Sequence, residues 1–294
     1  MNLTSERQFS RPYEKQQWRW VEQSMVHHDM KLSGTLWIPK EQKTEPFPLL
    51  IVAPGILADE SQDVVQSIAD TVVRDLGIAV FTMNYDNSDV WTYTLGHKQA
   101  LDYTVNHVKK SQEIDGEKIG ILGVSYGGGI ALLAREKRKA VIVLGAPINP
   151  FAITRNPYFQ RFSRLREDGA KLIGLRGVRL ASEFENPVPH KQDKPSDIED
   201  KKLLAEYATF HSPVVLIHAD EGADGLIPAE ESRRIFDAVP NGSLFILEKP
   251  KQPMNPKQVH NFEGSLRAPM LAVVKEAVKN LLIEDKPSWL QKRG

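Results

Sequence analysis

The chain has 294 residues, enough for one large domain or two small ones, with a substantial core. Its 38 basic and 38 acidic residues balance, so charge gives no reason to expect nucleic acid or an anionic membrane as a partner. There are no cysteines, which excludes disulfides, thiolate metal sites and a cysteine nucleophile together.

The N-terminal segment, residues 1–17, is polar and has no apolar core of the kind that a signal peptide needs. No later apolar run approaches the roughly 18 residues of a membrane span. We therefore expect a cytoplasmic protein that has no membrane span and carries a polar tail ahead of its folded domain.

The first apolar segments, WRWVEQSMVHH from Trp18 and KLSGTLWIP from Lys31, alternate as strands do and predict an antiparallel hairpin. Short continuous apolar runs follow, typical of strands buried on both faces of a sheet: residues 48–55, 77–85, 118–124, 140–147, 213–220 and 243–248. Helical patterns lie between and after them, over residues 60–76, 95–110, 125–138, 228–239 and 264–283. Such alternation predicts βαβ crossovers, hence a mostly parallel sheet with helices on both faces.

The alternation is interrupted between residues 149 and 211, where the chain is rich in charge and shows no strand pattern. We interpret this segment as an insertion that divides the core into residues 18–148 and 212–294. Insertions at the C-terminal edge of a parallel sheet lie where ligands bind, so a lid is expected rather than a decorative excursion. Its aromatic residues are candidates for lining an acyl pocket: Phe159, Phe162, Phe184 and Tyr207.

One stretch carries the main chemical signal. Gly123-Val124-Ser125-Tyr126-Gly127 fits G-x-S-x-G and lies between a predicted strand and a predicted helix, as this motif requires. The sharp turn strains the serine backbone and exposes its hydroxyl, and side chains at the two flanking positions would collide, so both need glycine. The helix N-terminus directs N–H groups at an anion that forms there. The plainer interpretation is a glycine-rich turn with an inactive serine.

A serine hydroxyl needs a base to remove its proton, and the base needs an acid to orient it. The segment VVLIHADEGADGLIP offers two acids, Asp220 and Asp224. Among eight histidines, His260 is the candidate base because it alone follows the last strand, in a loop just before the final helix. The chain order serine, aspartate, histidine is the one associated with this motif.

These residues resemble the α/β-hydrolase superfamily, and their layout is similar to lidded bacterial carboxylesterases of the dienelactone hydrolase and cinnamoyl/feruloyl esterase type. The resemblance extends from about Ser33 to the C-terminus and implies an α/β-hydrolase fold with an inserted lid. In that family the acid loop commonly reads histidine-glycine, a few residues, then aspartate, two residues and valine-proline. Here residues 224–228, DGLIP, match its end, which favours Asp224 over Asp220, while Ala219 replaces the usual glycine.

The oxyanion of a tetrahedral intermediate needs preorganised N–H donors. One is expected from the backbone of Tyr126, directly after the nucleophile, and the other from the loop after the strand at residues 48–53. By position, Ile56 is the predicted second donor, with Leu57 as the fallback.

Together these features predict a serine hydrolase that cleaves small carboxylic esters through an acyl-serine, using Ser125, Asp224 and His260. No metal or organic cofactor is implied. A thioesterase, acyltransferase or acyl-peptidase using the same triad is the alternative among enzymes. A catalytically idle member of the fold that binds a small molecule is the alternative from another class. The oligomeric state, a homodimer included, stays open.

Overall fold

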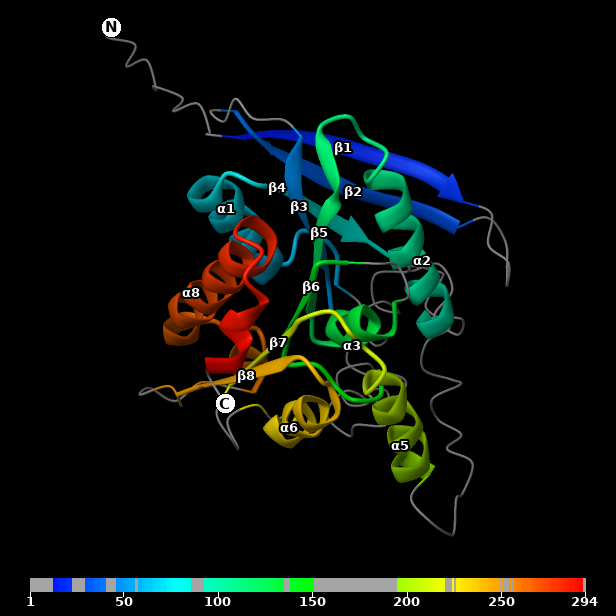
Figure 1. The fold of residues 1–294 in the computed structure, drawn as a ribbon, viewed down its shortest axis with the longest axis vertical. Coiled ribbons are helices and arrows are strands. Elements are labelled where there is room, and N and C mark those ends of the chain that lie inside the picture. The colour runs from blue at the N-terminus through cyan, green and yellow to red at the C-terminus, as the bar shows by residue number, and fades with distance from the viewer. Residues whose placement is uncertain are drawn as a thin grey trace, which may run out of the picture.

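The computed structural model describes residues 13–22, 30–40, 46–55, 58–85, 93–134, 138–150, 195–219, 224, 226–248, 250, 254 and 256–292. Within them, eight strands form one sheet in the order β1-β2-β4-β3-β5-β6-β7-β8 (Figure 1). Their bounds are β1 (Tyr13–Glu22), β2 (Met30–Pro39), β3 (Phe47–Ala53), β4 (Ala79–Asn84), β5 (Ile114–Val124), β6 (Ala140–Leu144), β7 (Val214–Ala219) and β8 (Gly242–Leu247).

The pairings β1–β2 and β2–β4 are antiparallel, and the remaining pairings, from β4 through β3 to β8, are parallel. All residues of β6 and β7 are buried, which suits their continuous runs of aliphatic side chains. The predicted N-terminal antiparallel pair and the mostly parallel sheet are thus both confirmed.

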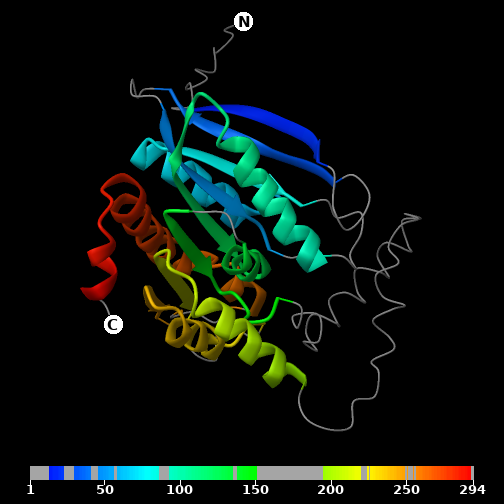
Figure 2. The same ribbon diagram turned by 45° about the vertical axis from the view of Figure 1, so that its right-hand side comes forward.

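Helices cover both faces of the sheet (Figures 1 and 2). One core cluster packs α1 (Asp63–Leu76) and α8 (Arg267–Val278) against one face. The other face is covered by α2 (Tyr93–Val108), α3 (Tyr126–Leu133), α5 (Pro195–Tyr207) and α6 (Ala229–Ala238). Short helical elements complete the C-terminal part: α7 (Pro256–His260), η3 (Gly264–Leu266), η4 (Lys279–Ile283) and η5 (Pro287–Lys292). None of the helices in the described ranges is both long and apolar enough to span a membrane.

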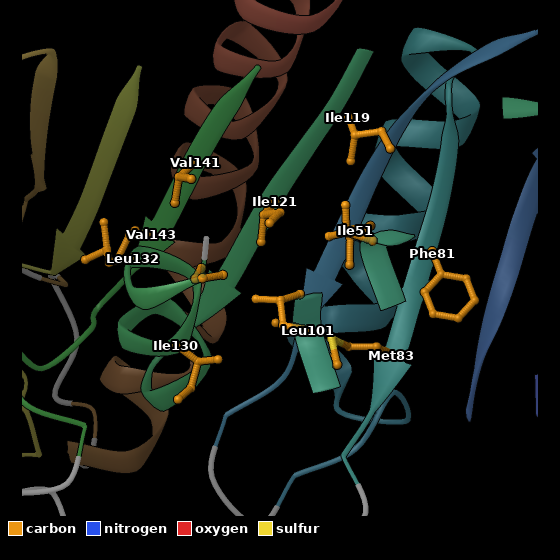
Figure 3. Packing of buried hydrophobic residues seen from close by; sticks show 14 of the residues in the cluster. Ile51, Phe81, Met83, Leu101, Ile119, Ile121, Ile130, Leu132, Val141 and Val143 are labelled. Atoms are coloured by element: carbon orange, nitrogen blue, oxygen red, sulfur yellow. The ribbon is translucent and has the colours of Figure 1, made fainter. Parts of the chain in front are cut away.

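The core on the α2 and α3 face consists of side chains that project from the sheet onto these two helices (Figure 3). Ile51, Ile121 and Val143 come from three adjacent strands, and Leu101 and Ile130 approach them from the helices. Truncating one such side chain to alanine typically costs about 2–5 kcal/mol. The strands that carry the site are therefore held firmly from both faces.

The N-terminal boundary differs from the prediction. Residues 13–17 belong to strand β1 and not to a polar tail. Tyr13 is buried, its hydroxyl donates to the Asp70 carboxylate at 2.7 Å, and its ring lies 5.1 Å from that of Trp37. One face of this edge strand is open to solvent, so polar residues alternate with buried ones along it. Because of these polar residues, the sequence pattern did not indicate a strand at residues 13–17.

In the predicted insertion, the structure describes α5, while residues 151–194 lie outside the described residues. Tyr207 of α5 is buried, and its hydroxyl donates to the Ile148 carbonyl at 2.8 Å. Its place in an acyl pocket stays a prediction. The Ile148 N–H donates to Glu231 of α6, also at 2.8 Å. The chain just beyond β6 is thus fixed by two helices.

The sheet also defines where a ligand would bind. From β3 the chain passes to β4 on one side and then to β5 on the other, so the strand order reverses between β3 and β5. In open α/β sheets, the crevice outside the carboxyl ends of the strands at such a point is the usual ligand site. Ser125 follows β5 directly at this edge.

Candidate active site

Ser125 occupies a sharp turn between β5 and α3, with φ 54° and ψ −122°. Its N–H donates to the Leu144 carbonyl at the end of β6 at 2.7 Å, and its carbonyl accepts from the Gly128 N–H at 2.9 Å. A positive φ is rare for a residue other than glycine and stores about 1–3 kcal/mol of strain. The surrounding main chain therefore fixes the serine in a conformation that it would not adopt alone.

The flanking glycines are required for two different steric reasons. A Cβ on Gly123 would collide with the backbone of Gly127, which is the obstacle that the motif predicts. A Cβ on Gly127 would instead collide with the carbonyl oxygens of Ala53 and Pro54 at the end of β3. The turn is thus packed against the neighbouring strand as well as against itself.

The loop after β3 lies beside the serine. A Cβ on Gly55 would be 3.5 Å from the Cβ of Ser125, an ordinary contact distance. The predicted oxyanion donor Ile56 and its fallback Leu57 lie outside the described residues. Tyr126, the other predicted donor, is the first residue of α3, so its N–H belongs to the first turn of the helix.

The side chain of Tyr126 anchors this helix start in a buried aromatic cluster. Its hydroxyl lies 3.1 Å from Nδ1 of His97 on α2, and the His97 ring stacks on Tyr85 with centroids 4.2 Å apart. Burial raises the pKa of the Tyr85 hydroxyl well above its usual value, so it stays protonated. Sequence reasoning assigned no role to His97 beyond its place on a helix.

Asp224 and His260 are brought together. His260 Nδ1 lies 2.7 Å from Asp224 Oδ2, and both residues are buried. The other carboxylate oxygen, Oδ1, accepts from the N–H groups of Leu226 and Ile227 at 2.9 and 3.2 Å. Burial pushes the pKa of Asp224 upward, but the hydrogen bond and charge of His260 outweigh it, so this pKa lies below its usual value. Asp220, the other predicted acid, lies outside the described residues.

The partners of this imidazole determine its tautomer. An ionised carboxylate only accepts hydrogen bonds, so Nδ1 of His260 carries the proton that faces Asp224. In the neutral ring, Nε2 is then the basic nitrogen. This is the arrangement that a general base of a serine hydrolase requires.

His260 does not lie in a loop as predicted, because it ends the short helix α7. The helix is closed by hydrogen bonds from the Phe262 N–H to the Val259 carbonyl and from the Glu263 N–H to the Gln258 carbonyl. This is the pattern of a Schellman turn, with Phe262 at φ 51° in the position usually taken by glycine. The missing glycine concealed the turn from sequence reasoning.

A second histidine, His218, is buried beside Asp224. The sequence pattern placed it only at the end of a core strand. His218 Nε2 lies 2.9 Å from the Ile227 carbonyl, and Nδ1 lies 2.8 Å from the Ser232 hydroxyl. A carbonyl only accepts, so Nε2 carries the hydrogen and Ser232 donates to Nδ1. Nε2 is also 3.6 Å from Asp224 Oδ2. Burial lowers the pKa of His218 and the Asp224 carboxylate opposes this only in part, so the ring is held neutral.

Gly145, which follows β6, places the acid–base pair relative to the serine. A Cβ on this glycine would lie 3.7 Å from Nδ1 of His260 and 3.8 Å from Oδ2 of Asp224. The preceding residue, Leu144, accepts the hydrogen bond from the Ser125 N–H. Asp224 and His260 thus lie beside the residue that follows β6, and the main chain of Ser125 is bonded to the last residue of that strand. No hydrogen bond links the Ser125 hydroxyl to His260 within the described part of the chain.

In the described ranges, no group of three or more histidine, aspartate or glutamate side chains is arranged to hold a metal ion. Polar groups at this edge of the sheet instead form hydrogen bonds with one another, such as those from His218 to the Ile227 carbonyl and from His260 to Asp224.

The sequence matches no protein-family model. It is 26% identical over 184 residues to the bis(hydroxyethyl) terephthalate hydrolase of Streptomyces coelicolor, covering 61% of this chain and 56% of that protein. It is 24% identical over 196 residues to the putative carbamate hydrolase RutD of Pseudomonas syringae, covering 57% of this chain and 75% of that protein. The first of these matches therefore spans little more than half of the relative.

Among solved structures, Est1E of Butyrivibrio proteoclasticus with ferulic acid bound gives a TM-score of 0.60 at 19% identity, covering 86% of this chain and 96% of that one. The Pyrococcus furiosus esterase Pf2001 gives 0.62 at 15% identity, covering 92% of each chain. Dienelactone hydrolase of Anabaena variabilis gives 0.58 at 13% identity, covering 91% and 99%. The chain has the α/β-hydrolase fold, and the predicted similarity to esterases of these types is confirmed at the level of fold.

Proposed function

We propose that the protein is a serine esterase that hydrolyses small carboxylic esters. The observation that carries the proposal is the buried Asp224–His260 hydrogen bond of 2.7 Å, located against Gly145 beside the strained turn of Ser125. An ionised acid hydrogen-bonded to Nδ1 of an imidazole, at the same carboxyl edge of the sheet as the serine turn, supports acyl transfer.

The proposed reaction proceeds in two halves. The Ser125 hydroxyl attacks the ester carbonyl, and Nε2 of His260 takes its proton while Asp224 stabilises the imidazolium. The tetrahedral intermediate collapses, His260 returns the proton to the leaving alcohol, and the acyl-serine remains. Water, deprotonated by His260, then attacks the acyl carbon and releases the carboxylic acid and free serine.

The developing oxyanion would be stabilised by the backbone N–H of Tyr126 and a second N–H from the loop after β3, at Ile56 or, failing that, Leu57. Each such donor is commonly worth about 3 kcal/mol in the transition state. The close approach of Gly55 to Ser125 supports a contribution from this loop.

The comparisons favour small esters as substrates. One structural neighbour has ferulic acid bound, and one distant relative is named as a terephthalate ester hydrolase. An ester panel that varies acyl length and aromatic character would identify the substrate class, and a matched thioester would separate an esterase from a thioesterase.

The direct test is covalent labelling by a fluorophosphonate probe. We expect wild type to be labelled at Ser125 and to hydrolyse p-nitrophenyl esters, and Ser125→Ala to lose both properties while keeping its fold. Ser61→Ala is the matched control, since Ser61 is an exposed serine that only caps a turn through Asp59. A folded wild type that neither reacts with the probe nor hydrolyses any ester would reject the proposal in favour of an idle, ligand-binding protein.

A further inference from the structure

The turn that follows His260 is under local strain. Phe262 has a left-handed φ of 51°, which costs a bulky residue about 1–2 kcal/mol, and its ring is buried in the core against α1 and α8. A helix end also leaves main-chain carbonyls without intrahelical partners. A contact from outside the turn must therefore hold it, and with it the imidazole of His260, two residues before Phe262.

Arg267, the first residue of α8, supplies the missing donors. Its Nε donates to the Phe262 carbonyl at 2.9 Å and its Nη2 to the Asn261 carbonyl at 3.3 Å. Its Nη1 faces the other way, toward α1, where it donates to the Ser67 hydroxyl and pairs with the Asp63 carboxylate at 2.9 Å. One guanidinium thus joins the turn after His260 to the first turns of α1.

A second contact joins the same two segments. Nε2 of Gln62, the residue before α1, donates to Oδ1 of Asn261 at 3.4 Å. Because α1 follows the loop after β3, these contacts tie the segment that carries the predicted base to the segment that leads from the predicted oxyanion loop. About 200 residues of sequence separate the partners, so only the folded chain brings them together.

We propose that Arg267 is a positioning residue that holds the imidazole of His260 in line with Asp224 by fixing the carbonyls of Asn261 and Phe262. The catalytic part of this inference rests on the proposed esterase function. Arginine suits the role because its planar fork presents several donors at once and keeps its charge at every working pH. The side chain is only 17% exposed, so its contacts are partly shielded from water, whereas its partner Asp63 is 84% exposed.

The test uses Arg267→Lys, which keeps a charge beside Asp63 but cannot reproduce the fork to both carbonyls. We expect kcat to fall roughly tenfold to a hundredfold, since small misplacements of a catalytic group have effects of this size. KM should change by less than about twofold, because Arg267 contacts no part of the proposed serine turn. Two controls should retain wild-type kcat: Asp63→Asn, which removes only the exposed ion pair, and Arg74→Met, which removes another arginine pairing with aspartates on α1.

A spectroscopic measurement makes the test independent of activity. The His260 Nδ1 proton, held in a short bond to a carboxylate, should give a strongly downfield proton resonance that is absent in His260→Gln. In Arg267→Lys we expect this resonance to shift or broaden, and in both controls to stay unchanged. A lower melting temperature with unchanged kcat and an unchanged resonance would overturn the positioning role. If wild type hydrolyses no ester but the resonance still responds to Arg267→Lys, the geometric role stands and the esterase proposal fails.

Discussion

The two halves of the candidate site are held by different kinds of force. On the serine side, the main chain fixes Ser125 through a strained turn and through hydrogen bonds of the serine's own backbone. The space around the flanking glycines is too small for a side chain. On the acid–base side, the side chains of Asp224 and His260 bond to each other, and the side chains of His218 and Arg267 lie against the segments that carry them.

Each half is therefore sensitive to a different kind of substitution. A steric site fails when atoms are added, because a Cβ has nowhere to go. A hydrogen-bonded site fails when the character of one donor or acceptor changes while the volume stays the same. Substitutions can therefore be chosen that damage one half and spare the other.

The largest effect is expected from Asp224→Asn. The amide can keep accepting the N–H groups of Leu226 and Ile227 through its oxygen, but its NH₂ group then faces His260 and favours the wrong tautomer. We expect kcat for a good ester substrate to fall about 10⁴-fold with a melting temperature close to that of wild type.

Asp220→Asn is the matched control for this prediction and should lower kcat less than about threefold. Steady-state kinetics on purified, folded variants decide between the two acids. A larger loss of kcat in Asp220→Asn than in Asp224→Asn would contradict the assignment of Asp224 as the acid.

A stability effect on the serine side comes next. Gly127→Ala should lower the free energy of unfolding by about 3 kcal/mol or more, because its Cβ would strike the main-chain carbonyls at the end of β3. Gly55→Ala, whose Cβ would meet Ser125 at 3.5 Å, should cost less than about 1 kcal/mol. Urea denaturation measures both, and equal losses would contradict the steric account of the turn.

The smallest effect concerns His218 and pH. Since its pKa lies below the ordinary 6.5, the unfolded chain binds more protons than the folded protein once pH drops below that value, and stability is lost as pH falls. His218→Gln removes this group while keeping a donor for the Ile227 carbonyl. We expect the melting temperature of wild type to fall more steeply than that of the variant as the pH is lowered below 6.5.

Asp224 does not interfere in that window, because its lowered pKa places its own loss of stability below its ordinary value of 3.8. His211→Gln, at an exposed position, is the control and should run parallel to wild type. Parallel curves for wild type and His218→Gln would mean that burial does not hold this histidine neutral.

The same contrast explains what the sequence could predict. The turn at Ser125 is encoded within five consecutive residues, because the collisions that define it are local or involve the adjacent strand. Chain order and position after the last strand were enough to nominate His260. The role of Arg267 could not be predicted, because it depends on a hydrogen bond to Ser67, 200 residues earlier in the chain. His218 lies only nine residues before its partner Ile227, but a sequence pattern does not show which atoms of a loop approach one another. The short helix α7 was missed because phenylalanine replaces the glycine that would have marked its end.

The two hydrogen bonds that hold the main chain of Ile148 have a consequence for engineering. Tyr207 of α5 donates to the Ile148 carbonyl and Glu231 of α6 accepts from the Ile148 N–H, so the chain just beyond β6 is fixed by these two helices. Neither bond is made by a residue of the segment 151–194, so a redesign of that segment would leave both partners of Ile148 in the chain.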